Sequence, residues 1–312
     1  MHSTISRWTV AVVAAVALTA CTGRQLTPPA AAGRPTPPAS DPARHLPIEA
    51  YMLTPWQSVE LDHVTDAAIS ACMSRYGWNY PVAQLPAPDS AAVASRALLY
   101  RRYGVTDPAS VRIWGYHLPH APRNAPRTPA PAVNLSQFPP AARSTLLGAA
   151  AGPVPHSAAG TAIPHGGCVG EAHGLIHADS ASSQGPGAEP GGLIARIKQK
   201  TFERSLGDHR VTAVFARWSA CMAARGYHLA DPLHAADHLS MAAPKPSRAE
   251  ITQALADVAC KKRTGLVARW LAVESEYQRS MMAKNAGPLA AVAAARAREA
   301  ADINSLMSRF GG

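Results

Sequence analysis

Residues 71–78 read Ala-Cys-Met-Ser-Arg-Tyr-Gly-Trp, and residues 220–227 read Ala-Cys-Met-Ala-Ala-Arg-Gly-Tyr. Both stretches contain Ala-Cys-Met, three further residues, a glycine and an aromatic residue. One more cysteine follows each stretch, Cys168 after the first and Cys260 after the second. A Gly-Leu-aliphatic triplet follows each of these later cysteines, at spacings that differ by one residue. The chain is therefore predicted to consist of two related halves.

The repeat also favours one pattern of disulfide bonds. Without Cys21, which belongs to the N-terminal segment, four cysteines remain, and four cysteines allow three pairings. In an oxidising compartment disulfides are the expected state, and one bond per half gives Cys72–Cys168 and Cys221–Cys260. Each would stabilise the fold by roughly 4 to 5 kcal/mol in the chain-entropy estimate. The chain contains no Cys-x-x-Cys, which argues against a redox-active pair.

The N-terminal residues have the pattern of a bacterial lipoprotein signal. Arg7 supplies a positive charge, residues 8–17 are mainly apolar, and residues 18–21 read Leu-Thr-Ala-Cys, a lipobox. About ten apolar residues are too few to span a bilayer, which needs roughly 20, but they suit a signal peptide. We expect cleavage after residue 20 and acylation of Cys21, which would anchor the protein on the outer face of the cytoplasmic membrane. The alternative is an ordinary secreted protein with an incidental cysteine.

The rest of the chain divides by composition. Residues 22–47 are rich in Pro, Ala and Thr, which favours a disordered, polyproline-like spacer; a ligand for a Pro-recognising domain is the alternative. The predicted organisation is a signal peptide (1–20), a lipidated cysteine and tether (21–47), a first helical half with a Pro-rich loop (48–180), a Gly/Ser linker (181–192) and a second helical half with a long C-terminal hairpin (193–312).

A mainly all-α fold of disulfide-stapled helical hairpins is predicted, because the sequence is rich in Ala and strand signals are few. Capping-box patterns begin helices at Thr54 and at Ser247. The other expected helices are 89–103, 193–206, 208–225 (capped by Asp208) and 289–310, and the helix after Ser247 is expected to continue past Gly265 to about Asn285. Short strands are expected only near 111–114 and 161–163, and the Pro-rich residues 119–140 are expected to form an extended loop.

Several short motifs resemble those of a known group. They are Leu-Pro-Ile-Glu-Ala-Tyr (46–51), Arg-Tyr-Gly (102–104), Gly-Tyr-His (115–117), Gly-Gly-Cys-Val-Gly-Glu-Ala (166–172) and the two Cys-Met pairs (72–73 and 221–222). With the lipobox and tether, the chain resembles actinobacterial secreted lipoproteins of unassigned function. That resemblance implies helical architecture and paired disulfides but no reaction. By analogy alone, it points to a role beside envelope transport systems.

Two sets of side chains are candidates for ligand sites. The pairs His173/His177 and His234/His238 have the i, i+4 spacing that zinc can use on a helix, although solvent-facing histidines are the plainer interpretation. Trp78, Tyr103 and Tyr116 could line a ligand groove, or they could belong to the core.

Charge and missing motifs limit the function. The formal net charge is +10, and removal of Arg7 with the signal peptide leaves about +9. Outside the membrane this favours an anionic wall polymer or an envelope protein as partner, and not nucleic acid. The basic cluster at 261–263 is expected to be a solvated helix face.

No catalytic motif appears and no cofactor is expected. The favoured function is a non-enzymatic binding or accessory module for an envelope transporter or cell-wall component; the alternative is a metal-dependent or wall-modifying hydrolase.

Overall fold

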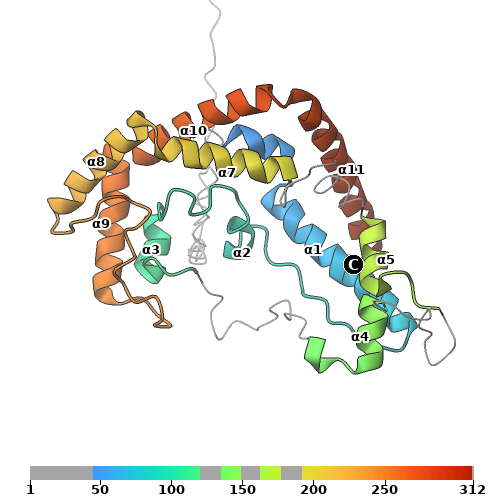
Figure 1. Ribbon diagram of the computed structural model, residues 1–312. Coiled ribbons are helices and arrows are strands. Elements are labelled where there is room, and N and C mark those ends of the chain that lie inside the picture. The colour runs from blue at the N-terminus through green and yellow to red at the C-terminus, as the bar shows by residue number, and fades with distance from the viewer. Residues whose placement is uncertain (1–44, 120–134, 149–161, 177–191, 311–312) are drawn as a thin grey trace, which may run out of the picture. The chain divides into compact units, whose positions relative to one another are not determined.

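The computed structural model describes residues 45–119, 135–148, 162–176 and 192–310 (Figure 1). The predictions for Cys21, the signal peptide, most of the tether, residues 181–191 of the linker and His177 lie outside these residues. The described helices, in chain order, are η1 (Pro47–Tyr51), α1 (Pro55–Arg75), α2 (Ala91–Ala94), α3 (Pro108–Trp114), η2 (Leu135–Gln137), α4 (Pro140–Leu147), α5 (Gly167–Leu175), α7 (Gly192–Leu206), α8 (His209–Ala223), α9 (Arg248–Thr264), α10 (Leu266–Ala283) and α11 (Ala286–Phe310).

The all-α prediction is confirmed, and both expected strands are wrong. Residues 111–114 belong to α3, which begins at Pro108. Asp107 is its N-cap, and the Asp107 carboxylate accepts hydrogen bonds from the N–H groups of Ala109 and Ser110. Ile163 lies in no strand, and the described residues contain only an isolated bridge position at Ala162. None of the described helices is both long and apolar enough to cross a membrane.

Two expected helices differ from the structure. The region 89–103 contains only the short α2, which ends at Ala94 and is followed by turns. Within these turns Arg101 has a φ of +54°, which no right-handed helix allows. The expected helix from 248 to about 285 is two helices. Gly265, at φ +64°, ends α9 and directly precedes α10, so this glycine is a C-cap and not a tolerated interior residue.

Both copies of the repeat end their helices in the same way. In α1 the N–H of Trp78 donates to the carbonyl of Met73 (3.1 Å), and in α8 the N–H of Tyr227 donates to the carbonyl of Met222 (3.0 Å). The glycine before each aromatic residue has a positive φ, as this Schellman motif requires. A further bond spans ten residues in each copy, from Ser70 to the Tyr80 carbonyl and from Ser219 to the Leu229 carbonyl. The structural repeat is thus longer than the eight-residue stretches quoted above.

The predicted disulfide pairing is confirmed. Cys72–Cys168 joins α1 to α5, and Cys221–Cys260 joins α8 to α9. All four cysteines are buried, each in an apolar cluster. The bonds therefore connect helices that already pack together, which is consistent with a structural role.

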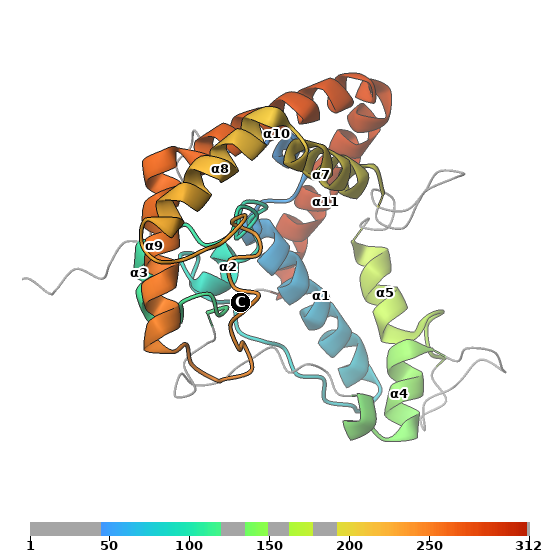
Figure 2. The same ribbon diagram turned by 60° about the vertical axis from the view of Figure 1, so that its left-hand side comes forward.

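Helix packing crosses the expected boundary between the halves. α11 packs against α1 (Figure 2), where Leu306 and Val64 share an apolar cluster with Ile176. In the opposite direction, Leu46, Ile48 and the residues that follow α2 pack into the cluster around α7, α8 and α10. Segments on the two sides of the linker thus complete each other's cores.

Candidate functional site

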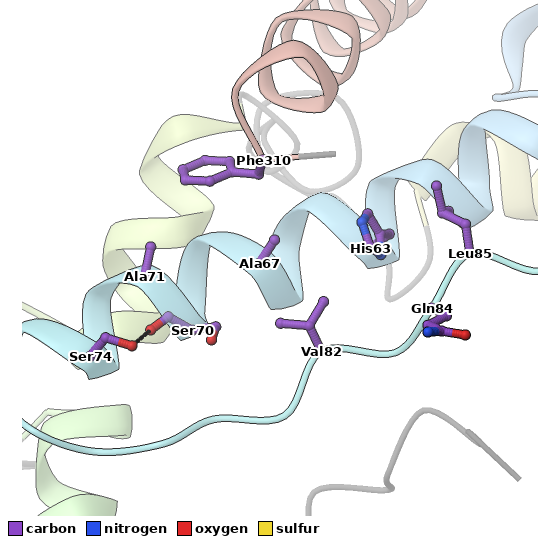
Figure 3. A pocket seen from close by; sticks show the side chains of 9 residues that line it. All are labelled: His63, Ala67, Ser70, Ala71, Ser74, Val82, Gln84, Leu85 and Phe310. Atoms are coloured by element: carbon purple, nitrogen blue, oxygen red, sulfur yellow. Dashed lines mark hydrogen bonds between the residues drawn. The ribbon is translucent and has the colours of Figure 1, made fainter. Parts of the chain in front are cut away.

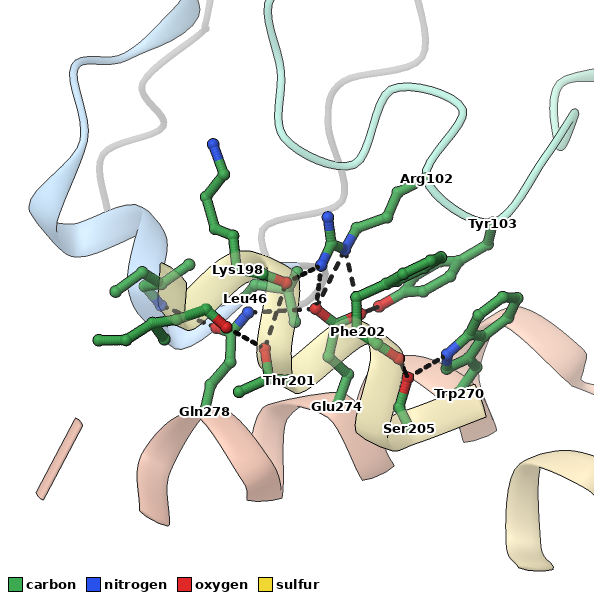
Figure 4. Close-up of polar contacts among 12 residues, drawn as sticks. Leu46, Arg102, Tyr103, Lys198, Thr201, Phe202, Ser205, Trp270, Glu274 and Gln278 are labelled. Atoms are coloured by element: carbon green, nitrogen blue, oxygen red, sulfur yellow. Dashed lines mark hydrogen bonds and ion pairs between the residues drawn. The ribbon is translucent and has the colours of Figure 1, made fainter. Parts of the chain in front are cut away.

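A buried ion pair holds α7 and α10 together (Figure 4). Glu274 of α10 is fully buried, and the Arg102 guanidinium donates to both of its oxygens (3.0 Å from Nε). The same guanidinium donates to the Lys198 carbonyl of α7 (2.9 Å), and the Tyr103 hydroxyl donates to Glu274 Oε2 (2.8 Å). Residues 102–103 are therefore tied to α10 through the Glu274 carboxylate and to α7 through the Lys198 carbonyl.

Three further buried bonds involve side chains of α10, and one of them joins it to α7. Gln278 donates to Glu274 and accepts from the backbone N–H of Ile48 in η1 (3.0 Å), while the Trp270 indole donates to the Ser205 hydroxyl of α7 (2.7 Å). Since both members of each pair are buried, losing either one would leave an unsatisfied polar group.

Burial and the neighbouring charges shift the pKa values of two groups in this cluster. Burial, and then the Glu274 charge, raises the pKa of Tyr103 well above its ordinary value, so its hydroxyl stays a proton donor. Burial, and then repulsion from Arg102, lowers the pKa of Lys198. Arg102 also lies over the Phe202 ring (4.6 Å), in van der Waals and cation–π contact.

A hollow of about 630 Å³ lies over the same two helices, and we call it the basic groove. Its lining contains four cationic side chains and one carboxylate, Glu203. Three of the cations, Arg196, Lys200 and Arg204, are spaced i, i+4, i+8 and therefore lie along one face of α7, about 6 Å apart. The fourth, Lys284, follows the C-terminal end of α10. The remaining lining residues are Thr201, Tyr277, Ser280 and Met281.

The wall of the basic groove formed by α10 is preorganised. The Arg204 guanidinium stacks on the Tyr277 ring (4.5 Å), whose hydroxyl donates to Asp208 Oδ2 (2.7 Å). Bonds from Arg210, and then from Tyr277, lower the pKa of Asp208, so this acceptor remains ionised. Lys200 has only a long contact to Glu203 (3.9 Å). The groove therefore combines exposed cations with a partly buried aromatic and thioether floor, a combination suited to an anionic ligand.

A second hollow, of about 580 Å³, lies between α1, the extended residues 82–85 and Phe310 at the end of α11 (Figure 3). No Asp, Glu, Lys or Arg lines it. Ser70 and Ser74 donate to backbone carbonyls, and His63 Nδ1 bonds the Ala83 carbonyl (2.9 Å). Its polar groups mainly serve to hold residues 80–85 against α1.

The aromatic residues expected to form a groove are not brought together. Trp78 packs in the cluster of the Cys72–Cys168 bond, whereas Tyr103 is buried in the cluster of α7, α8 and α10. Tyr116 borders the latter cluster and donates a long hydrogen bond to Asp257 (3.4 Å). None of the three lines either hollow.

The candidate metal pairs gain no support from the geometry. Residues 231–239 form no helix, so the i, i+4 spacing does not align His234 with His238. His234 bonds Asp231 (2.8 Å), and His238 bonds the Gln253 side chain (3.0 Å). His173 lies near the end of α5, which finishes at Leu175, before His177. Across the described ranges, no group of three or more His, Cys, Asp or Glu is arranged to hold a metal ion.

A second buried ionic cluster joins α3 to α9. Only half of the capping box predicted there forms: the Ser247 hydroxyl accepts from the Glu250 N–H, but the Glu250 carboxylate turns away. It accepts instead from the N–H of Tyr116 (2.8 Å) and bonds His117 Nδ1 (2.9 Å). Because the other ring nitrogen of His117 faces the Ala243 carbonyl (2.9 Å), both nitrogens meet acceptors. The Glu250 bond, partly opposed by desolvation, raises the pKa of His117.

The basic cluster at 261–263 is only partly solvated. Lys261 is buried and donates to Asp257 (3.0 Å) and to the Val105 carbonyl (3.1 Å), which corrects the expectation of a fully solvated face. Lys262 and Arg263 are exposed. Lys261 is buried because the segment around Val105, far away in the sequence, packs against this face of α9.

The sequence contains one signal for the basic groove. The spacing of Arg196, Lys200 and Arg204 places a row of cations on one helix face, but the denser cluster at 261–263 is the more conspicuous basic feature. Comparison with known proteins adds no further assignment, because no protein family, curated protein or solved structure matches the chain.

Proposed function

We propose that this protein is a lipoprotein anchored through Cys21 on the outer face of the cytoplasmic membrane, and that its helical body binds an anionic component of the cell envelope. Its role in this proposal is binding and not catalysis. The observation that carries the proposal is the basic groove, where Arg196, Lys200, Arg204 and Lys284 are accompanied by a single carboxylate among the described lining residues.

The two disulfides support the extracytoplasmic location. Disulfides persist in oxidising compartments and are rare in the bacterial cytosol. The bonded cysteines lie at repeat positions within packed helices, so oxidation suits the fold. A body that is held at the membrane by acyl chains and carries a cationic groove would meet anionic envelope polymers directly.

Anion binding can be tested with a matched pair of charge-reversed variants. The full mature protein, purified in a neutral detergent, is titrated with tripolyphosphate and with poly(glycerol phosphate) by calorimetry. Arg196→Glu/Lys200→Glu should weaken binding at least tenfold, because it removes two groove cations and adds two like charges. Lys262→Glu/Arg263→Glu, with the same change in net charge on exposed positions of α9, should change binding by less than twofold. Equal losses in both variants would contradict the assignment of the groove.

The anchor can be tested separately. Mass spectrometry of the mature N-terminus should find a diacylglyceryl group on Cys21, and Cys21→Ser should release the protein from the membrane fraction or leave it unprocessed. An unmodified Cys21 in a membrane-free protein would contradict the anchor without bearing on the groove.

A further inference from the structure

We infer that the occupant of the basic groove is a linear phosphodiester polymer; this rests on the proposed function and names its ligand class. The row of cations on α7 is long enough to meet several anionic groups. Arg196, Lys200 and Arg204 occupy successive turns, so the row extends over about 12 Å. A compact anion reaches one or two of these cations, whereas a chain with one charge per repeat can pair with all three at once.

Positive charge lies on both walls of the basic groove. Lys284 belongs to the α10 side of the groove, whereas the row of three cations belongs to α7. A phosphate group that lies between the two walls can accept bonds from both of them, and successive phosphates of one chain can pair with cations on different walls. Arg196 and Arg204 offer the forked donors that bind phosphate in a bidentate manner.

The floor between the charges includes an aromatic ring and a thioether. Tyr277 and Met281 are partly buried and line the groove together with the cations. A phosphodiester polymer has carbon segments between its phosphates, and these can cover the ring and the thioether. A string of bare inorganic phosphates has no such segments. Arg204, already stacked on Tyr277, needs little reordering to meet an adjacent phosphate.

Glu203 supplies an internal check on the inference. It is the one carboxylate that the described part of the chain contributes to the groove lining, and it lies beside Lys200, so it competes with the polymer for that cation. Glu203→Gln should therefore tighten binding of the polymer severalfold. A gain of affinity cannot be produced by damage to the fold.

The experiment is a length series on the full mature protein, with glycerol phosphate and its oligomers of two, three, four and six phosphates, and with oligoglutamates of equal charge. Affinity for the glycerol phosphate oligomers should rise with each repeat to three or four and then level off. The logarithm of the affinity of the longest oligomer should fall against the logarithm of salt with a slope of about −2 to −3. Oligoglutamates should bind at least fivefold more weakly than the matching phosphodiesters.

Each outcome bears on the inference. If the hexamer binds no more tightly than the monomer, the polymer is excluded while the proposed anion binding stands. If oligoglutamates bind as tightly, the phosphodiester class is overturned, again without loss of the proposed function. If neither these probes nor tripolyphosphate binds, both fall. Tighter binding by Glu203→Gln that disappears on adding Arg196→Glu would support the inference.

Discussion

At the scale of the residue, two of the buried ion pairs join residues that lie far apart in the sequence. Arg102 and Glu274 are 172 residues apart, and His117 and Glu250 are 133 apart. A buried pair of this kind contributes little net stability compared with an apolar pair, but losing one member leaves the other charge uncompensated. Such pairs set which segments can pack together, so their effect is best seen by removing one partner.

Replacing Glu274 with Gln should destabilise the fold by about 3 to 5 kcal/mol, because Arg102 would remain buried without a counter-charge. The double variant Arg102→Met/Glu274→Leu should cost less than Glu274→Gln alone. Free energies of unfolding from denaturant titrations decide this. A double variant as unstable as the sum of its single changes would show that the two residues act independently.

His117 should make stability depend on pH. Its pKa is higher in the folded state than the unfolded value of about 6.5, owing first to the Glu250 bond and with opposition from the nearby Arg101 charge. The stabilisation is therefore complete below pH ~6.5 and is lost as pH rises through the higher folded pKa. We expect the wild type to be more stable than His117→Gln at pH 6, and this difference to shrink towards pH 9. Denaturant midpoints across that range provide the test, and a difference that does not vary with pH would refute it.

At the scale of the element, each copy of the repeat consists of the end of a helix with its cysteine and the segment that follows, which folds back to bond a serine of the same helix. Gly77 and Gly226 occupy the same place in two Schellman motifs, at φ +78° and +85°, and a Cβ atom at either position would meet nothing within 4 Å. Only backbone strain would therefore act on a substitution there. Gly167, at φ +68°, differs because a Cβ atom would come within 2.4 Å of the Leu146 carbonyl oxygen.

Gly77→Ala and Gly226→Ala should each lower the free energy of unfolding by about 1 to 2 kcal/mol, the cost of placing an L-residue in the left-handed region. Gly167→Ala should cost more than either, because the packing of α4 on α5 must also shift. Thermal or denaturant unfolding of the three variants measures this. Unequal costs at the two repeat positions would show that the motifs are not energetically equivalent.

Local signals explain why some elements could be predicted. Thr54 and Gln57 cap each other's backbone at the start of α1, and the cysteine repeat was sufficient for the disulfide pairing. At Arg101 and at the start of α9, a side chain bonds a distant partner that no local pattern can indicate. Arg101 donates to the carbonyls of residues 116 and 117. Glu250 does not cap its own helix, because its carboxylate bonds the backbone N–H of residue 116 and the ring of residue 117.

The candidate site was harder to predict than the fold. The cation row on α7 is visible in the sequence, but the second wall is not, because Lys284 and Tyr277 reach the groove only when α10 separates from α9 at Gly265. The sequence pattern favoured one continuous helix through that glycine. Arg102, which fixes α7 to α10, comes from a region expected to be helical, and no local pattern marks its partner Glu274.

At the scale of the whole molecule, the described body is one set of helices whose cores are completed from both sides of the expected linker. α11 returns to α1, and η1 packs against α10 and α11. The basic groove lies over α7 and α10, and the buried pairs between these helices keep its walls in place. In the proposed function, this body is held near the membrane and presents the groove to an anionic polymer.

The most direct measurement is crosslinking in intact cells from a photoreactive residue placed at Met281, on the floor of the groove, with the same residue placed at Lys262 as the control. We expect light-dependent attachment of a phosphate-containing polymer at position 281, little at position 262, and loss of the product when Arg196→Glu/Lys200→Glu is added. Equal attachment at both positions, or a product at 281 that contains no anionic polymer, would contradict it.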